Sequence, residues 1–238
     1  MKRALKIIGC VLLIAGVILI AFPRVAQWLY DKRARSTAEE FDNWCQELQQ
    51  ETEVTGEDEK EPYLTDLYEA MQKYNKDLYK NGQSGFRDAW SYQEASFDLT
   101  KWGRSDNMVG YIDIPKMDVR LPIYLGATEE NMRLGAVHLT QTSLPVGGEN
   151  TNCVIAAHRG YSMAAMFRDI EALEIGDEIT ITNFWETLTY KVVEIKVISP
   201  NDKKEVLIQE GRDLVSLITC HPYGYNYQRY VVYCERVK

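Results

Sequence analysis

Three side chains of complementary chemistry stand at the ends of predicted strands. Cys220 follows the run 214–219 and precedes a turn-forming stretch, and Arg229 opens the last predicted strand nine residues later. His158 ends another such run, 153–157. A thiolate attacks a carbonyl carbon, an imidazole moves protons, and a fixed guanidinium stabilises an oxyanion. If these strand ends converge on one rim of a barrel, the three groups suffice for acyl transfer.

The other cysteines fit structural positions better. Side chains alternate between faces along a strand, so Cys153 faces away from His158, and Cys234 faces away from Arg229. We expect both thiols to be small buried apolar groups. The chain has five cysteines and no Cys-x-x-Cys pair, which predicts neither a disulfide framework nor a zinc site. No metal or other cofactor is expected.

The remaining histidines leave one alternative open. His221 adjoins Cys220, and neighbours on an extended chain point apart, so it is a poor catalytic partner. His138 could be a base or a satisfied structural histidine, and spacing alone does not separate it from His158. The net charge of −8, with no long basic run, argues against a nucleic-acid partner.

The N-terminus predicts a membrane anchor over residues 1–30. A basic start is followed by an unbroken apolar run, 7–22, of sixteen residues. This is a little short of the roughly 20 residues that span a bilayer. Trp28 and Tyr30 lie beyond Pro23 and would extend the span at an interface. A cleaved signal peptide is the alternative, but no small-x-small cleavage site follows the run. The basic residues on both sides do not fix the orientation.

The next part of the chain, residues 31–106, is predicted to be a stalk or cap. Apolar residues recur at helical spacing between residues 36 and 80, with an acidic connection at 51–61. From 81 to 106 the periodicity dissolves, yet the segment is rich in aromatic residues. Solvated linkers rarely have this composition, so this segment should lie against the main domain.

Residues 107–238 read as a mainly β domain. Short β-branched or aromatic runs are separated by turn residues, and one brief helix is expected at about 164–173. Many short strands of this kind predict an all-β barrel or sandwich. The predicted strands are 109–114, 119–124, 153–157, 178–182, 188–199, 214–219 and 228–236.

Several motifs in order resemble the sortases, a family of cysteine transpeptidases. Residues 217–220 (Leu-Ile-Thr-Cys), followed by Pro-Tyr-Gly and then Arg229, resemble the sortase signature, which leads to an arginine on the next strand. Residues 156–160 (Ala-Ala-His-Arg-Gly) are similar to the sortase histidine strand. Residues 143–148 (Ser-Leu-Pro-Val-Gly-Gly) and Gly-x-x-His at 135–138 are similar to the pilin-polymerising class C.

The resemblance implies an eight-stranded sortase-type β-barrel with N-terminal helices and an N-terminal transmembrane helix. It gives the catalytic position to His158 and a structural position to His138. It implies cleavage of a Leu-Pro-x-Thr-Gly-like sorting signal after Thr, through a thioacyl intermediate on Cys220 that is passed to an amine. Thr219 would help to shape the substrate site. The implied location is a single-pass anchor in the cell membrane, with the catalytic domain on the extracellular face of a Gram-positive-type bacterium.

Class C sortases also cover the active site with an Asp-Pro-aromatic lid. Asp88-Ala89-Trp90 resembles this lid with Ala in place of Pro, which removes a fixed backbone angle and predicts a looser lid. His221 stands where that class usually has Thr, and the sequence ends at Lys238 without the second span that many members carry.

Three functions are weighed. The first is pilus assembly, with a pilin lysine as the acceptor amine. The second is a sortase that attaches single surface proteins to peptidoglycan. The third, of another class, is a membrane-tethered barrel that binds peptides without catalysis. The convergence of Cys220, His158 and Arg229 on strand ends favours an enzyme.

Overall fold

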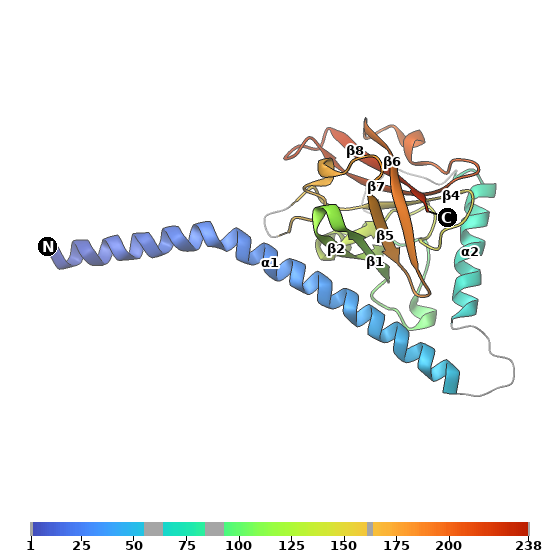
Figure 1. Cartoon of the computed structure of the whole chain (residues 1–238), viewed down its shortest axis with the longest axis horizontal. Coiled ribbons are helices and arrows are strands. Elements are labelled where there is room, and N and C mark those ends of the chain that lie inside the picture. The colour runs from blue at the N-terminus through green and yellow to red at the C-terminus, as the bar shows by residue number, and fades with distance from the viewer. Residues whose placement is uncertain (1, 55–63, 84–92, 161–163, 238) are drawn as a thin grey trace.

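The computed structural model describes residues 2–54, 64–83, 93–160 and 164–237. Its centre is a β-barrel to which helix α1 leads (Figure 1). The barrel is closed, with the strand order β1-β2-β3-β4-β7-β8-β6-β5. Two neighbouring pairs, β2–β3 and β4–β7, are parallel, and the others are antiparallel. The predicted eight-stranded, mainly β barrel is confirmed. The strands are β1 (Met108–Ile114), β2 (Val119–Leu125), β3 (Ala136–His138), β4 (Thr151–Ala156), β5 (Glu178–Thr182), β6 (Thr187–Ile198), β7 (Asp213–His221) and β8 (Gln228–Arg236).

The strands around the predicted site separate two apolar clusters by simple alternation. Cys153, Ile155 and Ala157 belong to the main core inside the barrel, as do the odd-numbered Val215 and Leu217 of β7. The intervening residues belong to a second cluster on the outer side of the sheet. This outer cluster includes Val154, Ala156, Ile218, Val231 and Tyr233. Both faces of β4, β7 and β8 are therefore buried, which makes these strands a rigid base for residues at their ends.

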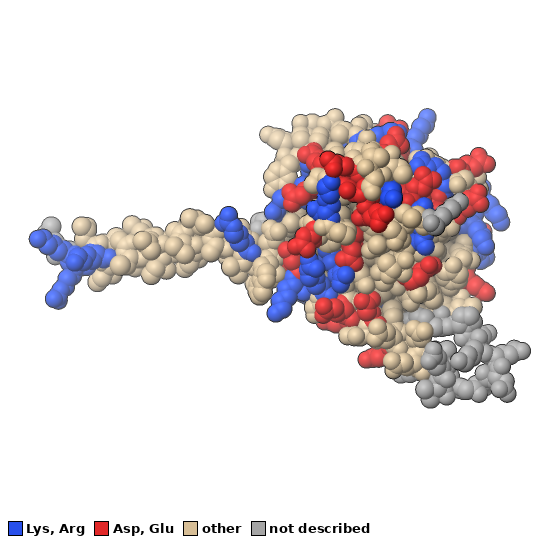
Figure 2. Space-filling model, viewed as in Figure 1, with Lys and Arg blue, Asp and Glu red and all other residues tan. Residues whose placement is uncertain are grey.

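Helix α1 (Lys2–Val54) is a single element that joins the apolar run to the barrel (Figure 1). It continues through Pro23. Its N-terminal part is exposed, and Figure 2 shows charged side chains at its tip and none along the stretch that follows. An 18-residue window of this helix has a mean hydropathy of 2.8 and no buried residue. The helix is long and apolar enough to cross a membrane.

The second half of α1 packs on the barrel. Ala34, Ala38 and Phe41 are buried in the main core with residues of β1 and β2. The hydroxyl of Tyr30 donates to the carbonyl oxygen of Leu134 at 3.0 Å. Tyr30 is therefore held against the barrel, whereas Trp28 is exposed, and the expectation that these two rings extend the span at an interface stays a prediction.

The other helices are short. Helix α2 (Thr65–Lys80) buries Leu67 and Met71 in the same core. Helix α3 (Glu129–Leu134) was not predicted, and Thr128 caps it by accepting a hydrogen bond from the Asn131 amide at 3.1 Å. The 3₁₀ helices are η1 (Thr100–Trp102), η2 (Pro115–Met117), η3 (Ile170–Ala172) and η4 (Lys203–Val206).

Two local expectations have different outcomes. The helix expected at 164–173 is wrong, because only η3 forms and the Phe167 amide donates to the carbonyl oxygen of His158 at 3.0 Å. The aromatic segment before β1 does lie against the domain where it is described. Phe97 and Trp102 stack at 5.8 Å between ring centroids and pack on the main core.

Candidate active site

Strand pairing brings the three predicted residues to one end of the barrel. In the antiparallel β7–β8 pair, Cys220 lies directly opposite Arg229. In the parallel β4–β7 pair, Ala156 lies opposite Ile218, so His158 and Cys220 each follow two residues after this pair. Strand β7 therefore has the predicted histidine on one side and the predicted arginine on the other.

The three residues lie on the outer side of the sheet. Cys220 has the same parity as Ile218, and Arg229 has the same parity as Val231, both of which belong to the outer cluster. Ala157 is packed inside the barrel, so the alternation persists past the end of β4 and places His158 on the outer side. An extended substrate lying over the ends of β4, β7 and β8 would meet all three groups.

A buried hydroxyl fixes the spacing of the two strand ends. The Thr219 hydroxyl donates to the carbonyl oxygen of Ala157 at 2.7 Å, and the Ala157 amide donates to that of Ile218 at 3.3 Å. The Thr219 side chain has no exposed surface. Its predicted part in shaping the substrate site stays a prediction, and this contact supports an indirect part, through the position of the segment that carries His158.

Arg229 is oriented by the turn between β7 and β8. Its side chain is nearly buried, with 6% of its surface exposed. Its Nη1 donates to the carbonyl oxygens of Asn226 at 2.6 Å and Gln228 at 2.8 Å. A guanidinium fixed in this way loses little conformational freedom when a developing oxyanion arrives.

Burial sets the resting protonation of the thiol and the imidazole. Burial raises the pKa of the Cys220 thiol, while the positive charges of Arg229 and Arg159 lower it to a lesser extent. Burial also lowers the pKa of His158. Both shifts favour the uncharged forms near neutral pH, so the thiolate–imidazolium pair is a minor state of the free protein.

Cys153, Cys234 and His138 are buried away from the predicted site. Cys153 and Cys234 are buried, and burial raises the pKa of both thiols. The ring of His138 is buried, with Nε2 3.0 Å from the carbonyl oxygen of Ser143 and 3.0 Å from the hydroxyl of Thr142. Burial lowers the pKa of His138 to about 4. The structure thus agrees with the structural reading of His138.

His221 lies on the inner side of the strand end, among charged groups that sequence reasoning passed over. Its Nδ1 is 2.8 Å from Nη1 of Arg159 and 3.1 Å from Oε1 of Glu171. Gly160 follows Arg159 at a φ of 76°, a conformation that favours glycine. The only sequence signal for this cluster was the pattern His-Arg-Gly at residues 158–160. Nothing in that pattern indicates that Arg159 would contact Glu171.

The predicted lid residues Asp88 and Trp90 lie outside the described residues. The chain on either side of residues 84–92 is held on the barrel. Gln83 donates to the carbonyl oxygen of Gln141 at 3.0 Å, and the Gln93 amide donates to that of Ala127 at 3.2 Å.

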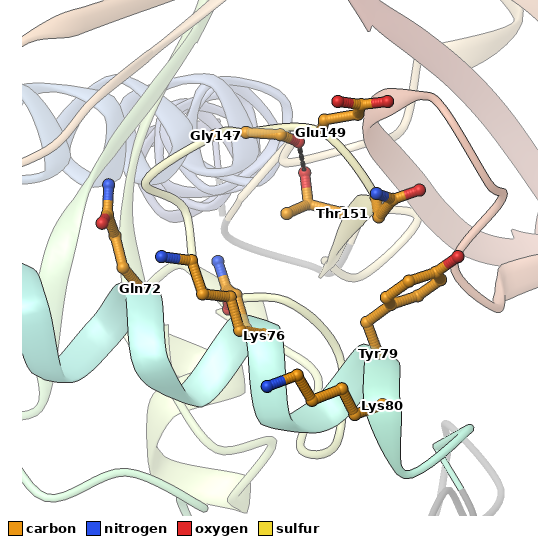
Figure 3. Close-up of a pocket in the computed structure, with 10 residues that line it drawn as sticks. Gln72, Lys76, Tyr79, Lys80, Gly147, Glu149 and Thr151 are labelled. Carbon is orange, nitrogen blue, oxygen red and sulfur yellow. Dashed lines mark hydrogen bonds between the residues drawn. The ribbon is translucent and has the colours of Figure 1, made fainter.

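A separate pocket of about 440 Å³ lies at the other end of β4 and β7. It is formed by one side of α2 and the loop that precedes β4 (Figure 3). Lys76 and Lys80 line it from α2, and Thr151 from the loop end. It contains none of the predicted catalytic residues. Across the described part of the chain, no group of three or more His, Cys, Asp or Glu side chains is arranged to hold a metal ion.

Comparison with known proteins defines the family. A sortase-domain family model matches residues 112–237, just over half of the chain. The chain belongs to the sortase family, whose members are cysteine transpeptidases. Among curated proteins it is 29% identical to sortase A of Bacillus anthracis over 71% of this chain and 78% of that protein. It is also 29% identical to sortase D of Bacillus subtilis (strain 168), over 54% of this chain and 63% of that protein.

Solved structures narrow the resemblance to class C sortases. The chain is similar to sortase C from Clostridium perfringens SM101, with 33% identity and a TM-score of 0.68, over 85% of this chain and 99% of that chain. It is also similar to sortase C from Streptococcus pneumoniae, with 28% identity and a TM-score of 0.65, over 85% of this chain and 97% of that chain.

Proposed function

We propose that the chain is a membrane-anchored sortase whose nucleophile is Cys220, with His158 and Arg229 as its partners. The observation that carries this proposal is the pairing of β7. Its penultimate residue, Cys220, lies opposite Arg229 in β8 and beside the segment that follows β4. A non-catalytic peptide-binding barrel would not require a thiol, an imidazole and a nearly buried guanidinium at one strand end.

The proposed reaction has two acyl transfers. The Cys220 thiolate attacks the carbonyl carbon of threonine in a Leu-Pro-x-Thr-Gly-like signal, and Arg229 stabilises the oxyanion that forms. His158, protonated, gives its proton to the leaving amine of glycine as the peptide bond breaks. A thioester between Cys220 and the threonine carbonyl remains. An acceptor amine then attacks this thioester, His158 takes the amine's proton, and the thiolate leaves.

The acceptor is proposed to be a lysine amine of a pilin, so that the products are covalent polymers. The similarity to class C sortases supports this choice, and the Streptococcus pneumoniae enzyme among them has been described in terms of its pilin substrate specificity. Attachment of single proteins to peptidoglycan is the alternative. A ladder of covalent oligomers would support the first, and a single adduct with a cell-wall amine would support the second.

We further propose that α1 anchors the enzyme in the cell membrane and that the barrel lies outside the cell. The exposed apolar part of the helix supports the anchor, and the buried part fixes the barrel to it. The anchor and the catalytic domain therefore share one rigid helix. A protein truncated at residue 37 would lose the core residue Ala34 and the Tyr30 contact, so experiments should use the full chain in detergent.

The test is the mass of the protein after incubation with a Leu-Pro-x-Thr-Gly peptide. An adduct corresponding to the peptide cut after Thr is expected on the wild type or on Trp90→Ala, and not on Cys220→Ala. The variant His158→Ala should also form no adduct while keeping the same melting temperature. An adduct that persists on Cys220→Ala would refute the assigned nucleophile.

A further inference from the structure

We propose that Arg159, held by Glu171 and His221, is a positioning residue that locks the segment carrying His158 to the strand end carrying Cys220. The proposal rests on the function proposed above, because it assigns a part in that reaction. Arg159 follows His158 directly, and His221 follows Cys220 directly. A contact between the second members of these two pairs therefore fixes the distance between the first members.

The contact is made by one guanidinium group. Its Nη1 lies 2.8 Å from Nδ1 of His221 and 3.4 Å from the carbonyl oxygen of Cys220. Its Nη2 lies 2.7 Å from Oε1 of Glu171, at the centre of η3. The planar fork of arginine presents its donors in fixed directions, so one side chain ties three separate segments together.

This contact continues the pairing of β4 and β7 beyond its last regular rung. That rung joins Ala156 to Ile218, and the Thr219 hydroxyl then bonds to the Ala157 carbonyl oxygen. The Arg159 side chain supplies the next link. His158 and Cys220 are therefore bracketed by a cross-strand tie on each side, and both can turn outward without loosening the strand ends.

The burial of Arg159 indicates more than a stabilising ion pair. Only 6% of its surface is exposed, and its guanidinium lies over the ring of Tyr230 at 5.6 Å. Its Nε is buried and has no hydrogen-bond acceptor among the residues that the structure describes. Buried ion pairs contribute little net stability, because desolvation offsets their attraction. A better physical reason for the Arg159–Glu171 pair is that it fixes the geometry beside the proposed nucleophile, Cys220.

His221 and Glu171 also contact each other. Nδ1 of His221 lies 2.8 Å from Nη1 of Arg159 and 3.1 Å from Oε1 of Glu171, so the imidazole, the carboxylate and the guanidinium form one cluster at the end of β7.

Arg159 also acts on the thiol through its charge. Among the described residues, the charges that act on Cys220 are Arg229, which lies opposite it in β8, and Arg159. The positive charge of Arg159 lowers the pKa of the Cys220 thiol, against the larger effect of burial. Loss of this charge should therefore be visible in the reactivity of the thiol, which a purely structural residue would leave unchanged.

The test compares Arg159→Gln and Arg159→Lys in the full chain, with Cys10 and Cys45 replaced by Ala. Arg159→Gln should raise the midpoint of the pH profile for Cys220 alkylation by about 0.5 unit or more, since a nearby charge is lost. It should lower kcat for acyl-enzyme formation by about 10-fold to 100-fold with KM within about twofold, as misplacement of a catalytic group does. Arg159→Lys keeps the charge but not the fork, so it should keep the alkylation profile and still lose kcat.

The matched control is Arg212→Gln, which breaks the Arg212–Glu235 ion pair of 2.8 Å near the far end of the same strands. This control should leave both readouts unchanged. If Arg159→Gln lowers the melting temperature while the alkylation profile and the kcat of the folded fraction stay those of the wild type, Arg159 only packs, and the proposal is wrong. Alkylation needs no substrate. Its pH profile therefore measures the effect of Arg159 on Cys220 even if the wild type were inactive on every sorting peptide.

Discussion

Replacing Arg229 by Gln removes the positive charge that lies opposite the predicted nucleophile. Cross-strand neighbours in an antiparallel pair have Cβ atoms about 4.5–5.5 Å apart, so we take a separation of about 6 Å between the guanidinium and the thiolate. With an effective dielectric constant of about 20 to 40, such a pair interacts by about 1.4–2.8 kcal/mol. This corresponds to about 1–2 pKa units. Arg229→Gln should raise the pKa of Cys220 by this amount.

The assay is the rate of Cys220 alkylation by iodoacetamide as a function of pH. Cys10 and Cys45 are replaced by Ala, because the other two cysteines, Cys153 and Cys234, are buried. Arg229→Gln should lower the alkylation rate at neutral pH by about 10-fold to 100-fold. At a pH high enough to ionise Cys220 in both the wild type and the variant, the two rates should be equal. Acyl-enzyme formation should fall further, because loss of one oxyanion donor costs about 10²–10³ in rate.

Arg229→Lys separates the two effects. Lysine keeps the charge but cannot reproduce the fork that donates to the carbonyl oxygens of Asn226 and Gln228. Alkylation should then remain near that of the wild type, while acylation still falls. An alkylation midpoint for Arg229→Gln within about 0.3 unit of the wild type would refute the electrostatic reasoning.

Three further predictions concern the anchor, the core histidine and the lid. Phe41→Ala should destabilise the protein by about 3–5 kcal/mol in urea unfolding, because this buried ring packs on Tyr111 and Phe184, and a loss below about 1 kcal/mol would contradict the packing of α1. The folded protein keeps His138 neutral down to a pKa of about 4, whereas the unfolded chain takes up a proton near 6.5. Stability should therefore fall by about 3 kcal/mol as the pH drops through this window, and His138→Gln should remove that part of the slope. Trp90→Ala should speed alkylation of Cys220 if the segment with Asp88 and Trp90 covers the active site as a lid. An unchanged alkylation rate would refute the lid assignment.

The barrel was predictable because most of its strands are self-evident in the sequence. Runs such as 178–182 and 228–236 match β5 and β8 at both ends, since β5 alternates buried isoleucines with more exposed residues and β8 is rich in β-branched and aromatic residues. Strand β3 was missed because Ala136–His138 is too short to show a period. It exists only through pairing with β2 and β4, which is tertiary information.

The helical errors have different physical causes. Helix α3 carried a readable signal, since Thr128 stands before two acidic residues, the usual start of a helix. The helix expected at 164–173 failed because the Phe167 amide donates to the His158 carbonyl oxygen, which removes a bond that a regular helix needs.

The pair Cys220–Arg229 was predicted from the sequence, whereas the contacts of Arg159 were not, because they depend on segments that are farther apart in the chain. Cys220 and Arg229 are close in sequence, and one hairpin is enough to join them. Arg159 needs Glu171 on η3 and His221 at the end of β7, which meet only in the closed barrel. No spacing rule relates Arg159, Glu171 and His221, so the role proposed for Arg159 could be inferred only from the structure.

The topology explains why the end of β7 suits the proposed nucleophile. At its C-terminal end, a strand with one parallel and one antiparallel neighbour lies beside the C-terminal end of the parallel strand and the N-terminal end of the antiparallel strand. The parallel neighbour β4 contributes a residue that follows it, His158, and the antiparallel neighbour β8 contributes a residue near its beginning, Arg229. Two antiparallel neighbours would instead place two strand beginnings beside Cys220, and the turn after His158 would lie at the opposite end of the barrel. The parallel β4–β7 pair is therefore the feature of the fold on which the proposed chemistry depends, and its last ties, at Thr219 and Arg159, are where substitutions should affect catalysis more than stability.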